Sequence, residues 1–151
     1  MNVDRTELLL REFEGALNTA FEAVEELDAL LRLHLGGNPS PIAEVESRAG
    51  REALACIREA GEEVQRIVHP PSPFTHFLMP PERRADRLRI LLRDAFGSVG
   101  ELDALILWVR GAEPTAGRSE PARRAMAALR RAARKLDLLM EALAASSAIA
   151  C

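Results

Sequence analysis

The chain contains an internal duplication. The run Leu17–Leu30 recurs 75 positions later as Leu92–Leu105, with nine identities in fourteen positions. The identical pairs are Leu17/Leu92, Ala20/Ala95, Phe21/Phe96, Val24/Val99, Glu26/Glu101, Leu27/Leu102, Asp28/Asp103, Ala29/Ala104 and Leu30/Leu105. The same offset also matches Gly36/Gly111, Pro39/Pro114, Ala53/Ala128 and Leu54/Leu129. The repeating unit therefore covers about half of the chain, and the fold must accommodate two similar units.

The first unit begins with an amphipathic helix. Its apolar residues follow an alternating spacing of three and four: Leu10, Phe13, Leu17, Ala20, Val24, Leu27 and Leu31. The pair Gly36-Gly37 ends this helix, and Pro41 opens a second helix that must stop by His69, because Pro70 disfavours a helical residue before it. The predicted core side of the second helix contains Leu54, Ile57, Val64 and Val68, with Ala53, Cys56 and Ala60 beside them.

The second unit repeats this plan. Its first helix carries the stripe Leu88, Leu92, Ala95, Val99, Leu102, Ile106 and Val109, and Gly111 closes it. Gly97 and Gly100 favour a break near Phe96 rather than near Phe21. Residues 119–121 open a last helix with the core side Ala122, Met126, Leu129, Leu136, Leu139, Met140 and Leu143, and residues 144–151 are predicted to fray.

Residues 69–82 form a stiff hinge between the units, because they hold five of the nine prolines. Phe74, Phe77, Leu78 and Met79 lie in this hinge. We expect them to cover an open end of the folded domain; the alternative is an exposed docking motif for a partner.

These patterns predict an all-α fold, a four-helix bundle built from two duplicated helical hairpins. The low aromatic content, 4% with no tyrosine, also favours helices over sheets. We expect one domain over residues 1–151, with repeat one at 4–69, the hinge at 69–82 and repeat two at 82–145. The alternative is two tandem, death-like helical domains.

Motifs that carry chemistry are missing from the sequence. His34, His69 and His76 lack the Glu-x-x-His spacing of metal-binding bundles, and His34 falls on the apolar stripe, which predicts a half-buried side chain. Cys56 and Cys151 fit neither a zinc site nor a disulfide scaffold, which is typical of a cytoplasmic protein. We therefore expect a protein that is not an enzyme, with no metal, no cofactor, no signal peptide and no membrane span.

Charge is divided unequally between the two halves. Residues 1–75 carry 14 Asp/Glu and 7 Arg, a net charge of −7, whereas residues 76–151 carry 9 Asp/Glu and 13 Arg/Lys, a net charge of +4. Either the halves attract each other within one molecule, or an acidic face of one molecule meets a basic face of another.

Three groups of residues are candidates for partner binding. The last helix carries a basic set, Arg123, Arg124, Arg130, Arg131, Arg134 and Lys135. Acids that the duplication retains outside the main stripe, together with Glu25, form a candidate acidic surface: Glu25, Glu26, Asp28, Glu101 and Asp103. The hinge adds Phe74 and Phe77. Each set also has a purely structural interpretation. The basic set can be a solvated helix face, the acids can form local ion pairs, and the phenylalanines can cover the core.

One known family resembles this pattern. The leucines of the first unit, Leu17-x-x-Ala20-Phe21 and Leu27-x-x-Leu30-Leu31-Arg32-x-x-Leu35-Gly36, followed by Ile42-Ala43, resemble the bacterial effector-associated domains. The second unit is similar from Leu92 to Gly111. These domains are small death-like helical adaptors of bacterial conflict and anti-phage systems. The resemblance implies homotypic contacts that bring effectors to a sensor, and no catalytic activity in the adaptor.

The unbroken stripe through Phe21 and the long last helix depart from the family and favour a plain bundle. The function predicted from the sequence is a non-catalytic adaptor or self-assembly module in the cytoplasm, which binds another protein or itself through charged helix faces. The alternative is a regulatory or nucleic-acid-associated bundle that uses the basic last helix.

Overall fold

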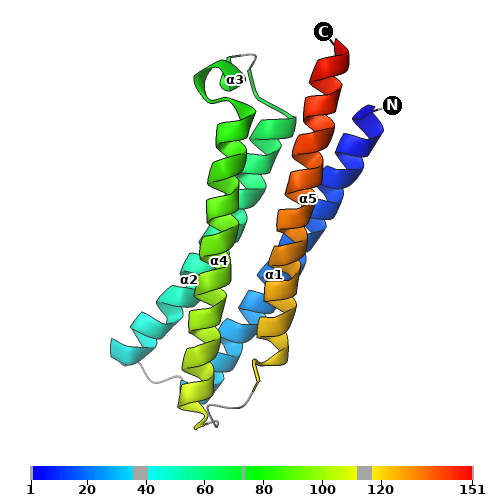
Figure 1. The fold of residues 1–151 in the computed structure, drawn as a ribbon. Coiled ribbons are helices and arrows are strands. Elements are labelled where there is room, and N and C mark those ends of the chain that lie inside the picture. The colour runs from blue at the N-terminus through cyan, green and yellow to red at the C-terminus, as the bar shows by residue number, and fades with distance from the viewer. Residues whose placement is uncertain (1, 36–40, 73, 112–116, 151) are drawn as a thin grey trace.

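The protein is a bundle of four long helices with one short helix at its end (Figure 1). The structure, a computed structural model, describes residues 2–35, 41–72, 74–111 and 117–150; within these ranges it leaves out the side chains of residues 2–4, 35, 41–47, 75–76 and 147–150. The elements are α1 (Asn2–Leu35), α2 (Pro41–Val68), α3 (Thr75–Leu78), α4 (Pro81–Val109) and α5 (Glu120–Ala150). The described residues contain no strand, so the predicted all-α fold is confirmed.

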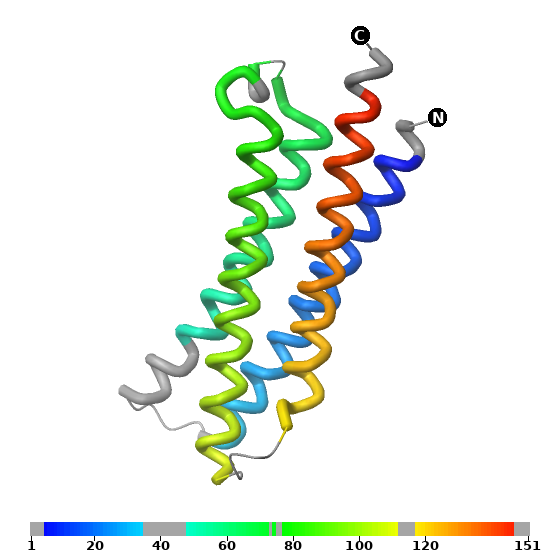
Figure 2. Tube along the Cα trace, viewed as in Figure 1, coloured from blue at the N-terminus to red at the C-terminus, as the bar shows by residue number. Residues whose placement is uncertain are grey.

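The two repeats form a single core. We call α1 and α2 the first hairpin, and α4 and α5 the second hairpin. Each first helix packs most extensively against the second helix of the other repeat, α1 against α5 and α4 against α2, while the contacts within each hairpin are smaller. Figures 1 and 2 show the two pairs side by side. This pairing rules out the alternative of two separate tandem domains.

The predicted stripes face this shared core. Every residue of the α1 stripe is buried, and in α4 only Val109 at the end of the stripe is half-buried. In α5, Met140 and Leu143 are half-buried while the other predicted residues are buried. Of the residues predicted for the core side of α2, Leu54, Cys56 and Val68 are half-buried and the others are buried. The hydrophobic effect at these positions supplies most of the stability of the bundle.

Helices α4 and α5 are both continuous. α4 runs without a break through Gly97 and Gly100, because residues on either side of them, including Val99 and Leu102, are fully buried and hold the helix in place. α5 continues to Ala150, so the predicted fraying from residue 144 is not observed. Other ends agree with the sequence: α2 ends at Val68, and Gly111, with a φ of +67°, follows the end of α4.

Candidate protein-binding surfaces

A short apolar segment lies exposed at the end of the bundle that also carries both termini (Figure 1). The N–H groups of Phe77 and Leu78 donate to the carbonyl of Phe74 at 3.1 and 3.0 Å, which closes the single turn of α3. Phe74, Phe77 and Leu78 are 70%, 85% and 80% exposed, and we call them the α3 apolar surface. The expectation that the apolar residues of the hinge cover the core is wrong for these three, because α2 and α4 pack directly against each other; the fourth, Met79, is half-buried.

A second pair of exposed apolar side chains lies near the C-terminal ends of α1 and α4. Leu33 and Trp108 are 73% and 72% exposed, and the offset of 75 makes them equivalent positions. The sequence analysis did not identify this pair, although large apolar residues at two positions related by the duplication are a signal that could have revealed it. Next to Leu33, His34 is exposed, so the predicted half-buried position is wrong.

Among the described side chains, four ion pairs join acids of repeat one to cations of repeat two. Glu12 pairs with Lys135 at 2.7 Å, Glu59 with Arg87 at 2.7 Å and Glu63 with Arg84 at 3.2 Å, and the fourth pair joins Glu26 to Arg124. The charge difference between the halves is therefore used at least partly inside the molecule. This agrees with the first of the two interpretations of the charge pattern.

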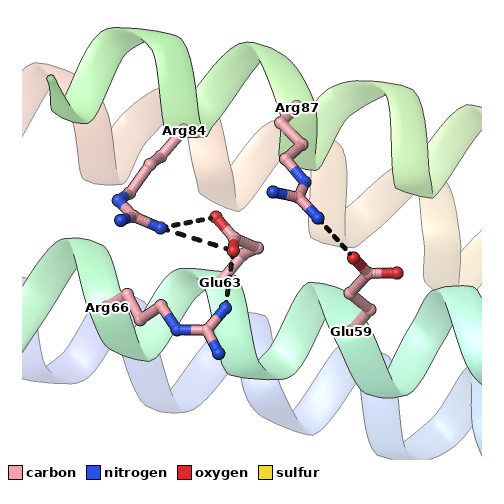
Figure 3. Close-up of polar contacts among 5 residues, drawn as sticks. All are labelled: Glu59, Glu63, Arg66, Arg84 and Arg87. Carbon is pink, nitrogen blue, oxygen red and sulfur yellow. Dashed lines mark hydrogen bonds and ion pairs between the residues drawn. The ribbon is translucent and has the colours of Figure 1, made fainter. Parts of the chain in front are cut away.

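Glu63, between α2 and α4, is a fully buried charge (Figure 3). Arg66 donates to its Oε1 at 2.7 Å, and Arg84 donates to its Oε1 and Oε2 at 3.4 and 3.2 Å. The Glu63 side chain is 0% exposed and the Arg84 side chain only 13% exposed. By the offset of 75, Glu63 corresponds to Leu138 and Arg84 to Leu9. The buried ion pair thus stands where the other copy of each helix has a leucine; Leu9 is buried, whereas Leu138 is 36% exposed.

The basic set of α5 divides into two groups. Arg124 and Lys135 are held by Glu26 and Glu12, as described above. The remaining four are exposed: Arg123, Arg130, Arg131 and Arg134. The guanidinium of Arg130 lies 5.1 Å from the centre of the Phe96 ring, a cation–π distance. Only the outward group is available to a partner.

The acids retained by duplication are not one surface. Glu25, Glu26 and Glu101 are exposed, but Asp28 is 9% exposed and Asp103 is fully buried. The interpretation of both aspartates as surface acids is wrong, because each lies four residues after a buried valine and shares the flank of the stripe.

Local contacts account for the retained aspartates. Asp103 accepts a hydrogen bond from Ser119 at 2.5 Å, next to the start of α5. Asp28 pairs with Arg32 at 2.9 Å, and its other oxygen lies so close to Gly50 that an added Cβ would be 2.9 Å away. These aspartates therefore serve contacts within the bundle.

Open grooves run between the helices. One, of about 520 Å³, lies between α2 and α4 and is lined by Cys56, Asp94, Gly97 and neighbouring side chains. Burial raises the pKa of the Cys56 thiol, and the charges of Asp94, Glu59 and Glu52 raise it further. The thiol therefore stays protonated at neutral pH, which makes it a poor nucleophile.

Two of the three histidine side chains, those of His34 and His69, are described. His69 lies 2.9 Å from Glu7 in an exposed pair, and the side chain of His76 lies outside the described residues. Across the part of the chain that the structure describes, no three His, Cys, Asp or Glu side chains gather in a way that suits a metal ion.

Among the described residues, none of the helices combines the length and the apolar character needed to cross a membrane. Fold and surfaces thus define a duplicated four-helix bundle with exposed apolar side chains at both ends. No known protein family, curated protein or solved structure matches the chain.

Proposed function

We propose that this protein is a non-catalytic protein–protein interaction module, an adaptor or a self-assembly unit that docks through the α3 apolar surface. The observation that carries the proposal is the exposure of Phe74, Phe77 and Leu78 on one short segment. Burying large apolar side chains is favourable by about 25 cal/mol per Å² of surface, so a partner that covers them gains affinity.

Charge has a supporting role in this proposal. The outward arginines of α5, Arg123, Arg131 and Arg134, have no ion-pair partner among the described residues, whereas Arg124 and Lys135 are used internally. A partner with an acidic face would be oriented by the unpaired group. The resemblance to bacterial effector-associated domains supports a place in cytoplasmic anti-phage signalling, with the module bringing an effector to a sensor.

The double substitution Phe74→Ser, Phe77→Ser should remove partner binding while leaving the bundle folded. Both side chains are exposed and contribute little to the core, so the helical circular dichroism signal and the unfolding midpoint should stay unchanged. The measurement is affinity capture from the source organism with quantitative mass spectrometry. A specific partner should fall at least tenfold with the variant, which corresponds to about 1.4 kcal/mol of binding free energy.

Ile90→Ser is the matched control, because Ile90 is also an exposed apolar residue but lies on α4 outside the α3 apolar surface. Capture of the same proteins by the wild type, the control and the double variant would contradict the proposal.

A second candidate function is binding to a nucleic-acid backbone through α5. The observation in its favour is the run of exposed cations, Arg123, Arg130, Arg131 and Arg134. It predicts retardation of a labelled oligonucleotide at low salt, with affinity that falls steeply as salt rises. Arg123→Gln with Arg131→Gln and Arg134→Gln should abolish the shift. Absence of any shift by the wild type at low salt would remove this candidate.

A further inference from the structure

We propose that a second copy of this chain is a partner and that it binds by exchanging hairpins. In the exchanged dimer, the first hairpin of each copy packs against the second hairpin of the other, and the segment between α2 and α4 crosses from one bundle to the next. This inference names a partner for the α3 apolar surface and in that respect rests on the proposed function.

The distribution of packing makes exchange possible. The extensive contacts, α1 with α5 and α2 with α4, all join one hairpin to the other, and the hairpins are covalently linked through residues 69–80. Each hairpin alone would leave its buried stripe open. The same interfaces form whether the two hairpins belong to one chain or to two, so exchange requires no new complementary surface in the core.

The connecting segment is poorly anchored to the bundle. Three of its four large apolar side chains face solvent, and the fourth, Met79, is half-buried. Its short turn is held by two backbone hydrogen bonds to the Phe74 carbonyl and by one from the Phe74 N–H to Ser72 Oγ at 3.2 Å. Pro70, Pro71 and Pro80 flank this turn and favour extended backbone. Straightening the segment therefore costs few contacts and produces a stiff connection between two bundles.

The exchanged dimer also gives the α3 apolar surface an occupant. Two connecting segments pass each other where the bundles meet, and the Phe74, Phe77 and Leu78 side chains of both copies can cover one another there. Within a single chain the linked hairpins meet at an effective concentration in the millimolar range, which favours the monomer. The contact between the two segments is the added interaction that favours the dimer.

Charge supplies a way to test which hairpin packs against which. Three ion pairs between the hairpins are partly exposed: Glu12–Lys135, Glu26–Arg124 and Glu59–Arg87. In each pair the acid belongs to the first hairpin and the cation to the second. Reversing the acids of the first hairpin places like charges against the second hairpin of the same chain. A second copy whose cations are reversed offers a second hairpin of opposite charge.

The experiment uses two full-length variants. The acid-reversed variant carries Glu12→Arg, Glu26→Arg and Glu59→Arg, and the base-reversed variant carries Arg87→Glu, Arg124→Glu and Lys135→Glu. Each alone should unfold several degrees below the wild type. After both are unfolded in urea and refolded together, we expect a heterodimer of twice the 16.6 kDa chain mass, with an unfolding midpoint close to that of the wild type. An affinity tag on one variant identifies the mixed species.

The control is the acid-reversed variant refolded with wild-type chain, in which one of the two exchanged bundles still contains three like-charge contacts. This mixture should give at least fivefold less heterodimer. A mixture of the two reversed variants that stays at the mass of single chains overturns the proposal, even if either variant alone folds poorly.

Wild-type chain supplies an independent readout. Light scattering after refolding at increasing concentration should show a dimer fraction that rises with concentration, and Phe74→Ser with Phe77→Ser should lower that fraction at least threefold. Wild-type chain that stays a single chain at every concentration counts against exchange.

The two proposals fail separately. If the chains do not exchange hairpins, the capture experiment still tests whether a different protein docks on the α3 apolar surface. If no partner is captured, the charge-reversal experiment still tests hairpin exchange.

Discussion

Replacing Arg84 with leucine should lower the free energy of unfolding by about 3 kcal/mol, because removing one partner of a buried ion pair leaves an uncompensated charge. The charge concerned is the carboxylate of Glu63, which is fully buried and would retain only Arg66 on the surface side. Urea denaturation followed by circular dichroism measures the loss.

The double variant Glu63→Leu, Arg84→Leu should recover the stability of the wild type or exceed it, because apolar replacement of a buried pair is often neutral or stabilising. Leucines occupy the equivalent positions, Leu9 and Leu138, of which Leu9 is buried and Leu138 is 36% exposed. Arg87→Leu is the control, since its pair with Glu59 is partly exposed and is worth at most about 1 kcal/mol. Equal stability of the Arg84 variant and the wild type would contradict the structural role of this cluster.

Leu27→Ala and Leu102→Ala should each destabilise the protein by about 3 kcal/mol, the usual cost of removing a fully buried leucine side chain. These leucines are equivalent in the duplication, and both are 0% exposed. Because the hairpins share one core, each substitution should shift a single cooperative transition of the whole chain. Calorimetry together with urea denaturation tests both the size and the cooperativity of the effect.

Leu33→Ala is the matched control, because Leu33 is largely exposed and its loss should change the unfolding free energy by less than about 0.5 kcal/mol. Two transitions, of which each core variant shifts only one, would show that the repeats fold as separate units.

Much of the fold follows from periodicity. The alternating spacing of the α1 stripe identified a helix, and every residue of the stripe is buried; prolines and glycines indicated helix ends. The pattern does not specify which stripe packs on which, since leucine has no preferred partner. The pairing of α1 with α5 and of α2 with α4 therefore required the structure.

The candidate surfaces were less predictable because burial of a polar residue depends on its neighbours in space. From the sequence alone, Glu63 resembles any solvent-facing acid of α2. Only the structure shows that Arg84 lies opposite it and that the pair is buried. Asp28 and Asp103 make contacts within the bundle, and identity between the two copies does not distinguish such a structural role from a functional one. Phe74 and Phe77 lie outside any periodic helix, so no pattern indicates which way they face.

The reversed charges of the two repeats make each repeat a poor partner for itself. Arg87 stands where repeat one has Glu12, and it contacts Glu59. In a bundle made of two copies of repeat one, Glu12 of one copy would take the place of Arg87 and lie beside Glu59 of the other copy. In a bundle made of two copies of repeat two, Arg87 would take the place of Glu12 and lie beside Lys135. The charges at these positions therefore favour pairing of unlike repeats, and covalent fusion supplies the two repeats in equal number.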